Sequence, residues 1–137
     1  MTRVLIVEDH RDIAELLRYN LETDSLDVTV ACDGGPALAE LRANAFDLLV
    51  LDLMLPEMSG LEVCKAVRCD PLLRDLPILI LTARGEESIR NLAFSLGAND
   101  YLLKPFHPGE LRLRVRNLLC RQEIPQPAEV AEWPGAR

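Results

Sequence analysis

Five polar residues that could act together lie at the ends of short apolar runs: Glu8, Asp9, Asp52, Thr82 and Lys104. Three carboxylates held close together repel one another, and a hard cation with oxygen ligands, such as Mg²⁺, relieves that repulsion. A carboxylate can also attack phosphorus and form an aspartyl phosphate. A lysine supplies a point charge for phosphate, and a threonine supplies a hydroxyl donor. These side-chain types therefore favour metal-assisted phosphoryl transfer, provided that the fold brings them together.

The acidic residues are candidate ligands for Mg²⁺. Asp9 and Asp52 are the best direct ligands, together with a main-chain carbonyl just after Asp52, and Glu8 is a candidate for binding through water. Two alternatives remain open. Glu8 and Asp9 would also suit the N-terminus of a helix, where acidic side chains are favoured. Asp52 would serve equally as a metal ligand that is not a nucleophile.

Lys104 and Thr82 are candidates for binding the phosphoryl group. The alternative for Lys104 is a salt bridge to the acidic residues, and the alternative for Thr82 is an ordinary residue at the end of a strand. Only the joint placement of these residues favours the functional interpretation. Met54 and Arg84 are expected to flank the site.

The elements that must position these residues alternate along the chain. Apolar runs of the kind found in strands buried on both faces of a sheet are separated by amphipathic segments with helical spacing. The runs expected to form strands are Val4–Val7, Val28–Ala31, Leu48–Leu51, Ile78–Leu81 and Tyr101–Leu103. The residues with helical spacing are Ile13, Leu16, Leu17 and Leu21; Ala37, Leu38 and Leu41; Leu61, Val63, Cys64 and Val67; Ile89, Leu92, Ala93 and Leu96; and Leu111, Val115, Leu118 and Leu119. Gly34-Gly35 is expected to form a turn before the second helix, and Gly97 to end the fourth.

Five alternations of strand and helix predict an α/β fold with a doubly wound, five-stranded parallel sheet and five helices. Right-handed crossovers favour the flavodoxin-like strand order 2-1-3-4-5. In such sheets the functional site lies beyond the carboxyl ends of the strands, where the strand order reverses. All five polar residues named above fall at that edge.

Composition limits the class of protein. The 137 residues carry a net charge of -7, which argues against a nucleic-acid surface on this chain. No apolar run is long enough to span a bilayer, and no signal peptide is visible, so we expect a cytoplasmic protein. The four cysteines form no Cys-x-x-Cys pair, and we interpret them as reduced and mostly structural. We expect the folded domain to span residues 1–121, and the proline-bearing segment 122–137 to be a linker or C-terminal tail.

The motifs resemble those of bacterial response-regulator receiver domains. The matching strings are VLIVED ending at Asp9, DLLVLDLMLPEMSG at 47–60 and LGANDYLLKPF at 96–106, in order and in strand context. The resemblance covers about residues 2 to 121. Each motif is weak alone, but together they form a specific signal.

The resemblance implies a role for each site residue. Asp52 resembles the phosphoacceptor, and Glu8 and Asp9 resemble the acidic pair for Mg²⁺, with the carbonyl of Met54 as a third ligand. Lys104 resembles the phosphate-binding lysine, and its peptide bond to Pro105 is usually cis in the family. Thr82 and Tyr101 resemble a pair of residues that switch conformation. The implied phosphoryl donor is a sensor histidine kinase or a small acyl phosphate.

Residues 82–115 are similar to regulators that carry a winged-helix DNA-binding domain. In those proteins two receivers pair through the last two helices and the strand between them. The matching charged residues are Arg90 with Glu110 and Asp100 with Arg114. The resemblance therefore implies a homodimer formed on phosphorylation, and contact with DNA only through an output domain outside this chain. Alternatively, these charged residues lie on a helix face that is exposed to solvent and forms no interface.

Three rivals remain. A flavin-binding protein of this fold would need a phosphate loop of small and hydroxyl residues after the first strand, where this chain has the acidic segment 8–12. An aspartate-nucleophile phosphatase would carry a second aspartate two residues after Asp52, where this chain has Met54. The third rival is a stand-alone or degenerate receiver that acts only by binding proteins. We therefore expect a signalling domain rather than an enzyme with external substrates.

Overall fold

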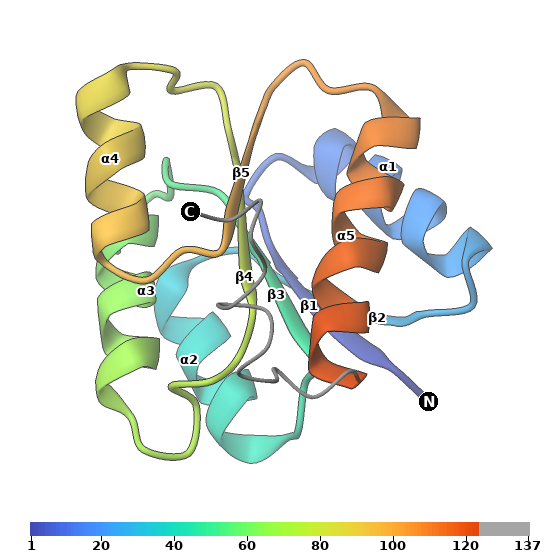
Figure 1. Cartoon of the computed structure of the whole chain (residues 1–137), viewed down its shortest axis with the longest axis horizontal. Coiled ribbons are helices and arrows are strands. Elements are labelled where there is room, and N and C mark those ends of the chain that lie inside the picture. Colours follow the sequence, from blue (N-terminus) through green and yellow to red (C-terminus); the bar gives the residue numbers. More distant parts are fainter. Residues whose placement is uncertain (124–137) are drawn as a thin grey trace, which may run out of the picture.

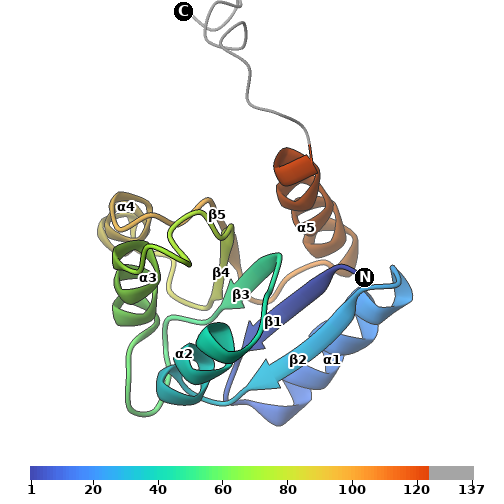
Figure 2. The same cartoon turned by 90° about the horizontal axis from the view of Figure 1, so that it is seen from below.

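A single parallel sheet organises the computed structural model, which describes residues 1–123 (Figures 1 and 2). The strands lie in the order β2-β1-β3-β4-β5, as the sequence predicts. They are β1 (Arg3–Val7), β2 (Asp27–Ala31), β3 (Leu48–Leu51), β4 (Ile78–Thr82) and β5 (Asp100–Leu103). The helices are α1 (Arg11–Thr23), α2 (Gly34–Ala43), α3 (Gly60–Cys69), α4 (Glu87–Ser95) and α5 (Pro108–Glu123). The α/β class and the strand order are confirmed.

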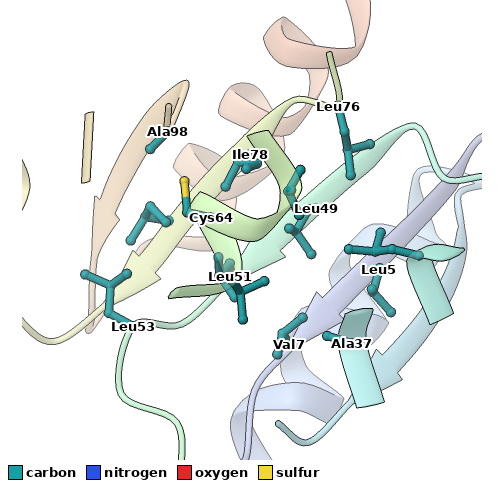
Figure 3. Close-up of a cluster of buried hydrophobic side chains, with 14 of the residues drawn as sticks. Leu5, Val7, Ala37, Leu49, Leu51, Leu53, Cys64, Leu76, Ile78 and Ala98 are labelled. Atoms are coloured by element: carbon teal, nitrogen blue, oxygen red, sulfur yellow. The ribbon is translucent and has the colours of Figure 1, made fainter. Parts of the chain in front are cut away.

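Helices cover both faces of the sheet (Figure 2). Successive side chains of a strand point to opposite faces, so each strand feeds two hydrophobic clusters. Leu5 and Val7 pack on the side of α2, α3 and α4, whereas Val4 and Ile6 pack on the side of α1 and α5. Figure 3 shows the first cluster, in which Cys64 of α3 lies over the central strands. This two-sided burial explains why the strands read as continuous apolar runs.

The strand register sets the place of the chemistry. Val7 of β1 is paired with Leu51 of β3, so Glu8 and Asp52 follow at neighbouring positions of the same sheet edge. On the other side of β3, Thr82 of β4 is paired with Leu103, the residue before Lys104. The polar residues named from the sequence therefore leave the sheet at one edge, because the strands are parallel.

Glycine behaves differently at two predicted boundaries. Gly97 follows the C-cap residue Leu96 with a φ of 110°, and the N–H of Ala98 reaches the carbonyl of Ala93, so the predicted end of α4 is confirmed. The predicted turn at Gly34-Gly35 is wrong, because α2 already begins at Gly34. Asp33 accepts a hydrogen bond from the Gly34 N–H and acts as the N-cap.

Some expected core residues lie at the surface. The side chains of Leu16 in α1 and Leu92 in α4 are 45% and 44% exposed, although their helical spacing suggested burial. Only Cys64 of the four cysteines is buried, so the interpretation of the cysteines as mostly structural is wrong.

The last helix extends beyond the predicted end of the domain. α5 continues to Glu123, so residues 122 and 123 of the expected tail belong to a helix, and the rest of that tail lies outside the described residues. No helix within residues 1–123 combines the length and the apolar character needed to cross a bilayer.

Replacing Gly60 by alanine should destabilise the fold more than replacing Gly35. A Cβ at Gly60 would meet the main-chain carbonyl of Asp52 and lie 2.7 Å from the Cα of Leu53, whereas a Cβ at Gly35 meets nothing within 4 Å. We expect Gly60→Ala to lower the free energy of unfolding by about 1–3 kcal/mol. Gly35→Ala should raise it by about 0.4–1 kcal/mol. Urea denaturation followed by circular dichroism measures both, and equal effects would contradict the close approach of α3 to the strand that carries Asp52.

Candidate functional site

A buried ion pair network joins three strand ends at the carboxyl edge of the sheet. The Nζ of Lys104, which follows β5, lies 2.5 Å from Oε1 of Glu8 and 2.9 Å from Oδ2 of Asp52. Glu8 and Asp52 are only 2% and 3% exposed. A buried carboxylate is costly unless it is paired, so the ammonium compensates two charges at once. The salt bridge that was the alternative for Lys104 is therefore formed.

The charge of Lys104 is held in place by its partners. Burial alone would lower the pKa of the ammonium, but the hydrogen bonds to Glu8 and Asp52, together with the charges of these two carboxylates, raise that pKa above its ordinary value. Lys104 is thus a permanent cation at neutral pH. It is the kind of group that can transfer its contacts to an incoming phosphoryl group.

The donor set on the other side of Glu8 suits a divalent cation. Glu8, Asp9, His10 and Asp52 each offer one ligand atom, and these atoms all lie within 4.8 Å of one another. The oxygens come from three carboxylates, which is the chemistry that Mg²⁺ selects. One ammonium cannot neutralise all three carboxylates, so the residues fit a bound cation. The carbonyl of Met54 as a further ligand stays a prediction.

The helix-cap alternative for Glu8 and Asp9 is only partly met. The N-cap position of α1 belongs to His10, and its side chain caps nothing. Glu8 accepts a hydrogen bond from the N–H of His10 at 3.0 Å through Oε2, while its other oxygen faces Lys104. Glu8 therefore serves the helix start and the charged cluster together.

Thr82 and Tyr101 are connected through the main chain of Arg84. The Arg84 N–H donates to Oγ of Thr82 at 3.3 Å, and the Tyr101 hydroxyl donates to the Arg84 carbonyl at 2.5 Å. Thr82 is fully buried, and Tyr101 is 4% exposed. Both hydroxyl groups are therefore bonded to the main chain of the same loop residue. Sequence reasoning paired Thr82 with Tyr101 but missed Arg84 as the link, because a main-chain contact leaves no trace in side-chain types.

The loop after β3 is held against the site by hydrogen bonds. The N–H of Met54 donates to Oδ1 of Asp52 at 3.1 Å, and Arg84 contacts the Met54 sulfur at 3.5 Å, so both residues flank the site as expected. Asp33 was missed from the sequence. Its carboxylate accepts from the N–H groups of Glu57 and Met58. Loss of hydration alone would raise the pKa of Asp33, but the bonds from Gly34, Met58 and Glu57 together lower it.

The Lys104–Pro105 peptide bond is cis, in agreement with the resemblance.

The expected dimer residues lie on α4, β5 and α5. Arg114 binds Asp100 at 2.7 Å and Glu110 at 2.9 Å within the same chain. Arg90 lies 5.8 Å from the centre of the Tyr101 ring, as in a cation–π contact. Within one chain, Arg114 thus pairs with Asp100, and Arg90 contacts the ring of Tyr101. The pairing of these residues across a dimer stays a prediction.

A family model, curated relatives and a solved structure all match the chain over most of the described residues. Residues 4–116 match the family model described as the response regulator receiver domain. The chain is 46% identical over 126 residues to the alkaline phosphatase synthesis transcriptional regulatory protein PhoP of Bacillus subtilis, covering 92% of this chain and 52% of that protein. It is 44% identical over 121 residues to the phosphate regulon transcriptional regulatory protein PhoB of Rhizobium meliloti, covering 88% and 53%. The solved receiver domain of the Francisella response regulator 1452 has a TM-score of 0.83 and 33% identity, covering 89% of this chain and 99% of that one. The chain thus spans about half the length of the curated relatives that it matches.

The buried phenol of Tyr101 should titrate late. Burial, and after it the Glu86 carboxylate, raises the pKa of Tyr101 above its ordinary value of about 10. Because the pKa is raised in the folded state, Tyr101 contributes stability that is complete below about pH 10 and is lost as the pH rises through the folded pKa. Absorbance at 295 nm should show a high-pH phase that Tyr101→Phe abolishes. Tyr19→Phe leaves the buried phenol in place and should keep the high-pH phase. A high-pH phase that persists in Tyr101→Phe would contradict the burial of Tyr101.

Proposed function

The chain belongs to the response regulator receiver family, and on that premise we propose that Asp52 accepts a phosphoryl group and so switches the face formed by α4, β5 and α5. The single observation that supports this most is the Lys104 ammonium shared between Glu8 and buried Asp52. It places a nucleophilic carboxylate, an acidic partner and a phosphate-binding cation within one hydrogen-bonded cluster. The role is that of a signalling domain.

The transfer itself asks little covalent chemistry of the protein. An Asp52 carboxylate oxygen forms a bond to phosphorus while the bond from phosphorus to the donor's leaving atom breaks, and the leaving group keeps that electron pair. Lys104 donates to Oδ2 of Asp52 before the reaction and offers its N–H groups to a phosphoryl oxygen afterwards. Oγ of Thr82 offers a further hydroxyl donor from the end of β4.

Glu8, Asp9 and Asp52 would hold the divalent cation, with the Met54 carbonyl as the proposed additional ligand. When bound, such a cation supplies charge neutralisation for the phosphoryl oxygens. The surrounding residues do the orienting. The Met54 N–H holds Oδ1 of Asp52, and Lys104 holds Oδ2, so the carboxylate plane is set before a donor arrives.

The switch uses the link through Arg84. If Oγ of Thr82 turns to a phosphoryl oxygen, it leaves the Arg84 N–H, and the Arg84 carbonyl that accepts from Tyr101 shifts with it. Phosphorylation adds roughly two negative charges and strong acceptor oxygens. It therefore favours one of two arrangements of the Thr82–Tyr101 region by differential contacts.

The phosphoryl donor that we propose is a sensor histidine kinase. A mostly apolar groove of about 350 Å³ opens beside Lys104, lined by Ile13 and Leu16 of α1 and by Pro105 and Phe106. An exposed apolar surface next to the nucleophile suits a protein donor that must place its phosphohistidine over Asp52. A small acyl phosphate needs only the charged cluster.

The output that we propose is a homodimer formed through the α4-β5-α5 face. Exposed apolar side chains gather there, from Leu92 of α4, Leu103 of β5 and Leu113 of α5, and charged residues accompany them. Such a mixture suits an interface with a polar rim. The relatives named above are transcriptional regulatory proteins. We therefore propose that dimerisation controls transcription, with DNA contacted through an output domain rather than through this acidic chain.

A small acyl phosphate with Mg²⁺ should add one phosphoryl group to the protein. Intact mass spectrometry is expected to show one adduct that is lost in Asp52→Asn and in EDTA, because the nucleophile or the cation is then missing. Asp12→Asn, which removes an exposed acidic residue of α1, is the matched control and should keep the adduct. Hydroxylamine should release the phosphate, as it does from acyl phosphates. An adduct that persists in Asp52→Asn would contradict the proposal.

Phosphorylation should raise dimer affinity in a way that depends on Arg90. Sedimentation velocity on the protein with beryllofluoride is expected to show a dimer, and Arg90→Glu should weaken it at least tenfold, about 1.4 kcal/mol, by reversing a charge on the α4-β5-α5 face. Lys65→Glu makes the same charge reversal on the exposed side of α3 and should leave the dimer intact. A monomer that persists in the wild type under full beryllofluoride occupancy would refute the dimer.

A further inference from the structure

A histidine stands beside the acidic cluster, and its role is not explained by the proposed phosphoryl transfer. The Nδ1 of His10 lies 3.1 Å from Oε2 of Glu8 and 3.4 Å from Oδ1 of Asp9. The main-chain N–H of His10 also donates to Oε2 of Glu8 at 3.0 Å, so the residue is held against the cluster by its backbone. The ring nitrogen nearest the backbone therefore faces carboxylate oxygens.

These spacings match those of neighbouring ligands on one cation. Around an octahedral ion with bonds of about 2.1 Å, adjacent ligand atoms lie roughly 3.0 Å apart. The separations of His10 Nδ1 from the Glu8 and Asp9 oxygens are close to that value. Asp52 completes the group, since all four ligand atoms lie within 4.8 Å of one another. This span is somewhat wider than the roughly 4.2 Å between opposite ligands of such an ion, so the side chains must move slightly inward to share one cation.

The two carboxylate oxygens of Glu8 face different partners. Oε1 binds the Lys104 ammonium, whereas Oε2 faces His10. The Oε2 side can therefore receive a cation while Lys104 keeps its contact. The side chain of His10 is 66% exposed, so the imidazole can adjust to a cation without rearrangement of the core.

A nitrogen ligand changes which cation the site prefers. Mg²⁺ selects oxygen ligands and gains little from imidazole, whereas Ni²⁺ and Zn²⁺ bind imidazole well and rank above Mg²⁺-like hard ions at mixed nitrogen and oxygen sites. Resting on the cation site proposed above, we propose that His10 is a fourth protein ligand and that it makes this site selective for borderline divalent cations such as Ni²⁺ over Mg²⁺.

Calorimetric titrations of the whole chain with Ni²⁺ and with Mg²⁺ test this. His10→Asn should lower Ni²⁺ affinity on the order of tenfold or more, and should change Mg²⁺ affinity less than about twofold. The sequence has two histidines, and the matched control is His107→Asn, because His107 lies just before α5 and its Nδ1 accepts from the Gly109 N–H of that helix. Both variants are made in a Cys32→Ser background, because Cys32 lines the same depression as Glu8 and Asp9 and would offer a thiolate.

Electron paramagnetic resonance of bound Cu²⁺ gives a readout that does not depend on affinity. Coupling to one imidazole nitrogen is expected in the Cys32→Ser protein and in its His107→Asn form, and should be absent in its His10→Asn form. Ni²⁺ affinity that His10→Asn leaves unchanged, while Mg²⁺ still binds and Asp52 is still phosphorylated, overturns the role of His10 alone. A protein that binds neither cation and accepts no phosphoryl group overturns the site itself.

Discussion

The lysine between two buried carboxylates is the contact on which the rest of this structure depends. Parallel strands bring their carboxyl ends to one edge, and in this chain that edge carries Glu8 and Asp52 with almost no access to water. Two carboxylates buried this close together are costly, through lost hydration and mutual repulsion, unless a cation lies between them. Lys104 arrives from β5, two strands away from β3, so its ion pairs tie together the strands that surround the reversal of strand order.

The same contact limits what the site can do. One ammonium neutralises part of the charge from Glu8, Asp9 and Asp52, and a phosphoryl group would bring roughly two further negative charges. The charges of the protein alone therefore neutralise the site neither before nor after phosphorylation. That imbalance makes a divalent cation part of the proposed chemistry, and it leaves the donors around Asp52 poised to exchange partners. In the proposed switch, the Arg84 main chain couples such an exchange at Thr82 to Tyr101, whose ring lies beneath Arg90 on the α4-β5-α5 face.

Much of the fold and the site could be predicted, because both depend on patterns that the sequence states directly. Strands buried on both faces read as continuous apolar runs, and the polar residue that ends each run falls at one edge. The errors share a different cause. Gly34-Gly35 reads as a turn, but the Asp33 side chain supplies the cap that lets α2 begin there. Leu92 fits the apolar spacing of α4, yet α4 presents it outward. Helical spacing shows which residues share one face of a helix, but it does not show whether another element covers that face.

Contacts made by main-chain atoms lay beyond sequence reasoning for a similar reason. Arg68 of α3 donates to the carbonyls of Gly97 and Leu76 and to the side chain of Asn99, and so holds the end of α4 against the start of β4. Nothing in the residue type of Gly97 or Leu76 announces that role. The consequence is mechanical: α4 is anchored firmly at its C-terminal end, while its N-terminal end follows the Arg84 loop. A change at Thr82 is therefore expected to move the N-terminal part of α4 and the Tyr101 ring more than the base of the helix, which concentrates the response on the surface where Arg90 lies.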